Sequence, residues 1–227
     1  ARAALAHSAV GTPESIRAIW NSPRGDDRIP AWKRERVTGG GSLVELAVHL
    51  FDLWRFLLNT EVTEVFVLTR HGRRHDESAV VSAKLANGVL ASAMISERTS
   101  HDIELEVCGD RGRLRVSAQR FDGLEQFGVK ETGGMLQPRL RHLANTLREL
   151  PRGLSGMHTL GDYGDSYRAQ WQHFVDVIAG KAPPACTLED GRAALRVVLA
   201  ATASASLGKP VMVAQAPRAI VAVGAHG

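Results

Sequence analysis

The spacing of apolar residues changes about 60 residues into the chain, and this change constrains the fold most. From Leu43 to Asn59 apolar residues recur every three or four positions, as in a helix. Beyond Asn59 four segments alternate apolar and polar residues or are rich in β-branched residues: 62–69, 78–85, 89–96 and 103–108. Asn87-Gly88 separates two of them and is a dipeptide typical of two-residue hairpin turns. The pattern predicts an antiparallel meander.

The two faces of this sheet differ in polarity. In segment 103–108 Ile103, Leu105 and Val107 point one way, whereas Glu104 and Glu106 point the other way. One face is therefore expected to be polar or open to a partner. Further strands are predicted over 14–21, 113–117 and 211–213, and helices over 1–10, 42–59, 139–150, 167–178 and from an N-cap at Thr187 to Gly208.

The longer helices carry periodic apolar stripes. Helix 42–59 has leucines at steps of three and four, which predicts one buried stripe: Leu43, Leu46, Leu50, Leu53 and Leu57. In helix 167–178, Trp171 and Phe174 have helical spacing and are predicted to lie in the core. The fold class expected is α+β, with a large, mostly antiparallel, open-faced sheet and helices packed on one face.

Composition excludes several classes of protein. The chain has 227 residues, 44% hydrophobic and 23% charged, which is ordinary globular composition. It contains no run of 18 apolar residues and no signal-like leader, so we expect a soluble, cytoplasmic protein with no membrane partner. Cys108 and Cys186 are expected to be free thiols. The net charge of +4 is dispersed, so we expect no nucleic-acid partner.

The domain boundaries follow the same patterns. We expect one domain over residues 1–213, with a variable insertion at 119–161 and a flexible tail at 214–227. The chain begins with Ala1, and residues 1–7 have the pattern of the middle or end of a helix. We therefore expect it to be a fragment of a longer protein.

Common catalytic signatures do not occur in this sequence. It has no Gly-x-Gly-x-x-Gly, no Gly-x-Ser-x-Gly, no His-Glu-x-x-His and no Cys-x-x-Cys. No dinucleotide-binding strand-turn-helix unit is therefore predicted, cofactor-binding residues remain unknown, and no metal ligands are assigned.

Glu45, His49 and Asp52 form the strongest candidate site. On an α-helix they lie within about 60° of one another and roughly 110° from the leucine stripe. Histidine suits proton transfer near neutral pH, and a carboxylate one turn earlier can orient it. The alternative is structural, because Ser42 and Glu45 also have the spacing of a capping box.

A long loop precedes this helix. Residues 22–41 carry several basic side chains, and loops of this length often reach into a cleft. We assign substrate binding to Lys33 on this loop and to Asp52 on the helix. The alternative is a solvated loop.

Residues 39–52, GGGSLVELAVHLFD, carry a family resemblance. They resemble the signature Gly-Gly-Gly-x-Leu-x-Asp-x-Gly-x-His-x-x-Asp of the glucose-fructose oxidoreductase, inositol dehydrogenase and rhizopine-catabolism (Gfo/Idh/MocA) family. Further similar segments follow in the family's order: 9–13, 87–88, 109–112, 167–178, 188–191 and 208–211. Position 45 is glutamate here, where the family has aspartate.

The resemblance implies the C-terminal substrate and oligomerisation domain of a two-domain NAD(P)-dependent oxidoreductase, without its Rossmann half. It implies that His49 takes a proton from a sugar or polyol hydroxyl, assisted by Glu45, as hydride passes to NAD or NADP in the complete enzyme. It also implies a homo-oligomer formed through the open sheet face. On its own, the chain is expected to be inactive. The alternative function is a non-catalytic ligand-binding or oligomerisation module.

Overall fold

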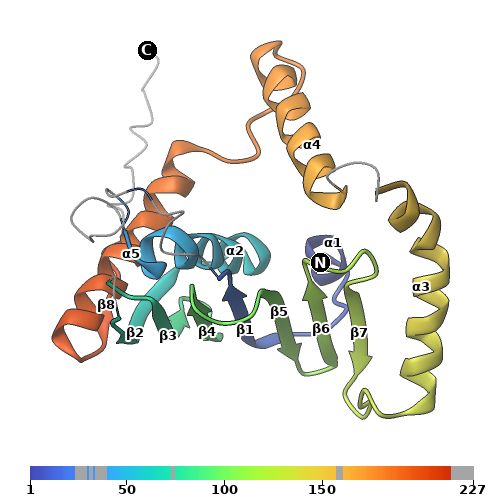
Figure 1. Cartoon of the computed structure of the whole chain (residues 1–227), viewed down its shortest axis with the longest axis horizontal. Helices are drawn as coiled ribbons and strands as arrows, with labels where there is room; N and C mark the ends of the chain where they lie inside the picture. The colour runs from blue at the N-terminus through green and yellow to red at the C-terminus, as the bar shows by residue number, and fades with distance from the viewer. Residues whose placement is uncertain (24–29, 31–32, 34–39, 73–74, 157–160, 216–227) are drawn as a thin grey trace, which may run out of the picture.

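An eight-stranded sheet forms the centre of the computed structural model, which describes residues 1–23, 30, 33, 40–72, 75–156 and 161–215 (Figure 1). The strand order is β7-β6-β5-β1-β4-β3-β2-β8. The strands are β1 (Pro13–Asn21), β2 (Val62–Arg70), β3 (Ser78–Leu85), β4 (Leu90–Ser96), β5 (Asp102–Gly109), β6 (Gly112–Ser117), β7 (Leu124–Gly128) and β8 (Val211–Met212).

The N-terminal strand lies in the middle of the sheet. β1 pairs in parallel with β4, from Ser15 opposite Leu90 to Asn21 opposite Ser96. Its other edge pairs antiparallel with β5, and the remaining neighbours in the sheet are antiparallel. The predicted strands are confirmed, but the direct β4–β5 pairing implied by a continuous meander is wrong because β1 separates these strands.

The helices are α1 (Arg2–Ala6), the π-helical turn η4 (Leu43–Ala47), α2 (Val48–Leu58), α3 (Leu136–Gly156), α4 (Gly161–Ile178) and α5 (Leu188–Leu207). η4, α2 and α5 cover one face of the sheet, with α5 against β2 and α2 against α5 (Figure 1). The expected class, an α+β fold with a mostly antiparallel open sheet, is confirmed. α3 and α4 lie to the side of this helical layer rather than on it (Figure 1).

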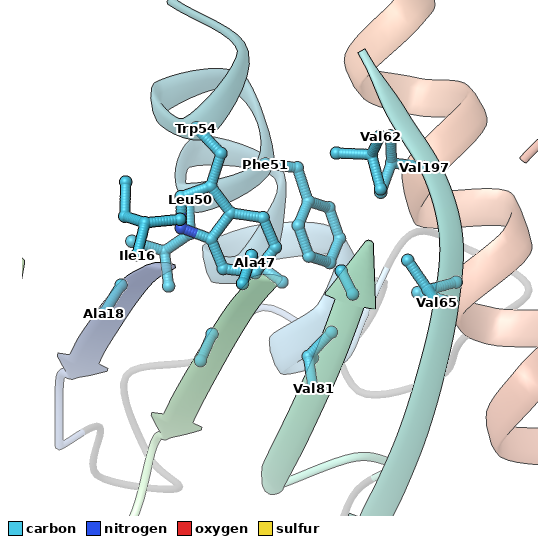
Figure 2. Packing of buried hydrophobic residues seen from close by; sticks show 14 of the residues in the cluster. Ile16, Ala18, Ala47, Leu50, Phe51, Trp54, Val62, Val65, Val81 and Val197 are labelled. Atoms are coloured by element: carbon cyan, nitrogen blue, oxygen red, sulfur yellow. The ribbon is translucent and has the colours of Figure 1, made fainter. Parts of the chain in front are cut away.

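The core lies between this helical layer and the central strands. Figure 2 shows Phe51 and Trp54 of α2 above residues of β1, β2 and β3, including Ile16, Val65 and Val81. Phe51 and Trp54 are fully buried, whereas the predicted stripe residues Leu53 and Leu57 are only partly buried. The π turn shifts the phase of the apolar stripe, because i→i+5 bonding adds a residue to one turn.

The ends of α2 and α5 follow their sequence signals. α2 ends at Asn59, which adopts the left-handed conformation with φ of 48°. α5 begins with a capping box between Thr187 and Asp190 and ends at the left-handed Gly208. Inside the layer, the buried Ser204 hydroxyl accepts from Val67 N at 3.0 Å and donates to Lys209 O at 2.7 Å. The bond to Val67 fixes α5 on β2, and the bond to Lys209 holds the segment that follows α5.

Arg55 joins three elements at the end of α2. Its guanidinium donates to both carboxylate oxygens of Glu61, at 2.7 and 2.8 Å, and to Asp52 Oδ1 at 3.2 Å. It also donates to the carbonyl of Asp190, in the first turn of α5, at 3.1 Å. The hydrogen bonds to Glu61 raise the pKa of Arg55 above its ordinary value. Arg55 therefore links α2 to the start of β2 and to α5.

α3 packs with its polar face toward the edge of the sheet. The Thr146 hydroxyl donates to Oδ2 of the buried Asp122 at 2.5 Å, and Arg141 donates to Gln126 O at 2.8 Å. Its opposite face carries leucines at steps of four and three that are 40–72% exposed: Leu136, Leu140, Leu143, Leu147 and Leu150. The helix is thus amphipathic with its apolar face directed away from the sheet.

The apolar stripe of α4 is also exposed. Trp171 is 65% exposed and contacts Phe174 edge to face, with ring centroids 5.9 Å apart. The prediction that these two side chains belong to the core is wrong, because α4 extends away from the sheet and its helical layer (Figure 1).

The face of the sheet opposite α2 and α5 combines apolar and charged side chains. Leu68, Val80 and Met94 are about half exposed on it. Glu106 is buried on this face in ion pairs with Arg17 and Arg113, so the face predicted to be polar carries paired acidic side chains. This side is open in Figure 1.

Several predicted segments fall outside the described residues. These include most of the loop 22–41, apart from Ser22, Pro23, Pro30, Lys33, Gly40 and Gly41, and residues 216–227 of the predicted tail. Gln215 is described and donates to Val62 O at 3.1 Å. Strand β7 and the whole of α3 lie in the predicted insertion 119–161, where only a helix was expected. Cys108 and Cys186 are free thiols, as predicted.

No helix within the described ranges is long and apolar enough to cross a bilayer.

Replacing Arg55 with Met is expected to lower the free energy of unfolding by about 2 kcal/mol, because three carboxylates lose a buried counter-ion. The matched control is Arg192→Met, which removes an exposed pair with Glu189 and is expected to cost less than about 0.5 kcal/mol. Urea denaturation of both variants measures the difference. Equal midpoints would contradict the linking role of Arg55.

Asp122 makes the attachment of α3 dependent on pH. Hydrogen bonds from Arg120 and then from Thr146 lower the pKa of Asp122 below its ordinary value. A carboxylate whose pKa is lower in the folded state stabilises the fold above its unfolded pKa, and this contribution is lost as pH falls through the folded pKa. Thr146→Val removes one donor and should shift that loss to higher pH.

Hydrogen exchange of α3 amides, followed as the pH is lowered below the ordinary pKa of an aspartate carboxyl, measures the shift. Thr202→Val in α5 is the control and should leave α3 protection unchanged. If α3 amides in Thr146→Val exchange as in the parent at every pH, the Asp122 contact does not hold the helix.

Candidate functional site

The candidate site begins with a π-helical turn. Gly41 has φ of 103° and its carbonyl accepts from the backbone N–H groups of Val44 and Glu45, at 3.2 and 3.0 Å. The N–H of Ser42 donates to Asp76 O at 3.0 Å. A side chain at Gly41 would meet the Asp76 carboxylate, so glycine permits both this backbone conformation and this close approach. Single π turns occur frequently at functional sites.

The capping box considered for Ser42 and Glu45 does not form. Ser42 already has helical backbone angles, φ −62° and ψ −27°, rather than the extended conformation of an N-cap. Its buried hydroxyl has no hydrogen-bond partner among the described residues. The side chain of Glu45 is therefore available for a different role.

Glu45 forms an ion pair with Lys33. Lys33 Nζ lies 2.7 Å from Glu45 Oε1, and the Glu45 side chain is only 10% exposed. The contact joins the loop after β1 to the first turn of the helix that carries His49. The structure thus brings together two predicted site residues that are 12 positions apart, a contact that helical spacing could not reveal.

His49 stacks on Trp20. Their ring centroids are 5.1 Å apart and the ring planes differ by 23°. His49 is an exposed residue near the start of α2, whereas Trp20 is half-buried near the end of β1. Trp20 was not identified as a candidate from the sequence. The available signal was its period-two relation to Ile16 and Ala18, which places all three on the helix-covered face.

Asp52 turns toward a different set of partners. Its Oδ1 accepts from Arg55 at 3.2 Å, in the cluster that also holds Glu61 and Asp190. A cavity of about 570 Å³ is lined by this cluster together with residues such as Phe56 and Cys186. Of the predicted site residues, Lys33 and Glu45 are thus in direct contact, while Asp52 is held by Arg55.

The arrangement places three chemical groups on neighbouring elements: the imidazole of His49, the ammonium group of Lys33 and the indole of Trp20. His49 presents an exposed imidazole, and an imidazole nitrogen can accept a proton. Lys33 supplies a positive charge that can hold a hydroxyl or developing oxyanion, with its position fixed by Glu45. Across the described ranges no group of three or more His, Cys, Asp and Glu side chains is arranged to hold a metal ion.

Comparison with known proteins identifies the family of this domain. Residues 2–213 match the family model GFO_IDH_MocA_C, described as the C-terminal alpha/beta domain of an oxidoreductase family. The myo-inositol 2-dehydrogenase of Thermotoga maritima is 28% identical over 211 residues, which cover 88% of this chain and 56% of that protein. The scyllo-inositol 2-dehydrogenase (NAD(+)) of Bacillus subtilis is 25% identical over 185 residues, which cover 76% of this chain and 47% of that protein.

Solved structures share the fold. The WlbA dehydrogenase from Bordetella pertussis, solved with NADH and UDP-GlcNAcA, matches with a TM-score of 0.73 and 16% identity, covering 94% of this chain and 60% of that chain. GenD2 from gentamicin A biosynthesis, solved with NAD, matches with a TM-score of 0.68 and 22% identity, covering 94% of this chain and 59% of that chain.

The chain thus spans roughly half the length of the two dehydrogenases it matches in sequence. The mostly antiparallel sheet, the helical layer on one of its faces and the motif of residues 39–52 all agree with the family that the comparison identifies. The chain belongs to the Gfo/Idh/MocA oxidoreductase family and corresponds to its C-terminal α/β domain.

Proposed function

We propose that this chain is the substrate-binding and catalytic-histidine domain of an NAD(P)-dependent dehydrogenase that oxidises a hydroxyl carbon of a sugar or polyol. The observation that carries the proposal is the Lys33–Glu45 ion pair at the first turn of the helix on which His49 is exposed. His49 accepts the proton of the substrate hydroxyl, because its side chain is exposed and an imidazole nitrogen can act as a proton acceptor.

Lys33 and Asp52 form the substrate-binding part of the proposal. Lys33 donates to a substrate oxygen while Glu45 holds its ammonium group in place. Asp52 lies one turn beyond His49; its Oδ1 accepts from Arg55, and its second carboxylate oxygen can accept from a further hydroxyl. A polyhydroxylated substrate offers neighbouring hydroxyls to such a set. The inositol dehydrogenases among the relatives support this substrate class.

The nicotinamide dinucleotide has no fitting site among the described residues. Dinucleotides bind at the carboxyl ends of parallel strands beside a glycine-rich turn. Here β1 and β4 are the parallel pair of a sheet that is otherwise antiparallel, and the sequence lacks the glycine fingerprint. In the complete enzyme NAD or NADP supplies the hydride acceptor. We assign that binding to a domain beyond these 227 residues, so the chain alone is inactive.

A second function, self-assembly, is favoured by the open face of the sheet. Leu68, Val80 and Met94 are 48–60% exposed there and lie on neighbouring strands. Exposed apolar patches of this kind mark interaction sites. We propose that two copies pair through this face.

The two free thiols, Cys108 and Cys186, fit a reducing compartment, which supports a cytoplasmic location.

His49→Gln tests the catalytic proposal in the complete enzyme. Loss of a general base is expected to lower kcat by about 10²- to 10⁴-fold. NADH formation with myo-inositol and with other polyols measures the change. The control is His7→Gln, which alters an exposed histidine near α1 and should keep parental turnover. Normal turnover of His49→Gln would refute the assignment.

Val80→Asp tests assembly through the open sheet face. A carboxylate buried in an interface without a partner is strongly unfavourable, so the variant is expected to be monomeric. Light scattering after size-exclusion chromatography measures the mass. Val129→Asp, at an exposed position after β7, is the control and should keep the parental mass. A monomeric parent, or an unchanged mass of Val80→Asp, would contradict pairing through this face.

A further inference from the structure

We propose that Trp20 is a positioning residue for His49, which fixes the plane of the imidazole ring and thereby the direction of its proton-accepting nitrogen. The inference rests on the proposed function of His49 in proton transfer. It begins from the stack of the two rings, whose centroids lie 5.1 Å apart with an interplanar angle of 23°.

The support beneath Trp20 is rigid. Trp20 lies on the central strand β1, opposite Ile95 of β4 and Ile103 of β5. The strand is therefore hydrogen-bonded along both edges. The indole is half-buried and packs against the hydrophobic core. Sites built on such elements hold their side chains more closely than sites on loops.

The histidine needs such support. His49 is an exposed residue one position after the start of α2, directly after a π turn. Glu45, the carboxylate one turn earlier, is ion-paired with Lys33. The described contact on the imidazole ring is the stack with Trp20. The aromatic ring thus supplies the orientation that a carboxylate supplies to many catalytic histidines.

Stacking has a geometric advantage for a base. It covers the face of the imidazole, while both ring nitrogens lie at the edge, in the plane of the ring. The stack can therefore limit rotation of the ring and still leave a nitrogen accessible to a substrate hydroxyl. Proton transfer requires that nitrogen within about 2.6–3.2 Å of the oxygen, so the orientation of the ring affects the rate.

The first test measures the stack in this chain by NMR, without cofactor or substrate. In the parent the ring protons of His49 should be shifted upfield by the indole ring current. The shift should be lost in Trp20→Leu and largely kept in Trp20→Phe. Trp171→Leu, which removes an exposed tryptophan of α4, should leave it unchanged. A His49 resonance unaffected by Trp20→Leu would overturn the proposal.

The second test measures turnover in the complete enzyme. Trp20→Leu should lower kcat by roughly 10- to 100-fold, the range expected for a misplaced catalytic group, with little change in KM. Trp20→Phe should restore most of the rate. A purely structural role for Trp20 predicts instead parallel changes in kcat and KM that Trp20→Phe does not restore, which would overturn the proposal.

The two proposals fail in distinguishable ways. If His49→Gln abolishes turnover while Trp20→Leu loses the stack and keeps kcat, the positioning role is wrong and the dehydrogenase proposal stands. If His49→Gln keeps turnover, the catalytic assignment is wrong and the role of Trp20 in catalysis falls with it. If Trp20→Leu does not fold, Trp20→Phe decides: parental kcat with the stack retained supports positioning, and a lost stack with unchanged kcat refutes it.

Discussion

The pairing of β1 with strands on both of its sides holds this domain together. β2, β3, β4 and β8 form one group of strands, and β5, β6 and β7 form another. Only β1 in the described sheet bridges the two groups, through its parallel ladder with β4 and its antiparallel ladder with β5. The helical layer depends on the same strand, because α2 packs over Ile16 and Ala18 (Figure 2). The central strand β1 thus connects the two groups of strands and also packs against the helical layer.

The candidate site takes its geometry from this arrangement. β1 presents Trp20 near its end, the following loop contributes Lys33, and the chain then enters the helix that carries Glu45 and His49. These residues lie within 30 positions of one another, yet their contacts cross from strand to helix and from loop to helix. The π turn at Leu43–Ala47 changes the helical phase between the glycine segment and His49. Rigid elements thus position the aromatic ring and the imidazole.

Much of the fold follows from local patterns, and the site follows from them only in part. Period-two alternation identifies most strands because each has a buried and an exposed face. β7 escapes this approach because Leu124–Gly128 is short and does not alternate. The motif locates His49 and Glu45, but the pairing of Glu45 with Lys33 and the stack of Trp20 are long-range contacts with no local signal. Similarly, the pattern of α3 reveals a leucine stripe without revealing that the polar stripe faces the sheet.

The central place of β1 also has a consequence for synthesis of the chain. β1 leaves the ribosome before either of its neighbours, since Ser15 pairs with Leu90 and with Cys108. At about 5–20 residues per second, the strand remains without its partners for roughly 4 to 19 s. During this interval both of its edges can pair with other chains, so crowded ribosomes and fast overexpression expose this domain to aggregation. The strand that unites the finished sheet must therefore wait for both of its partners while the protein is being made.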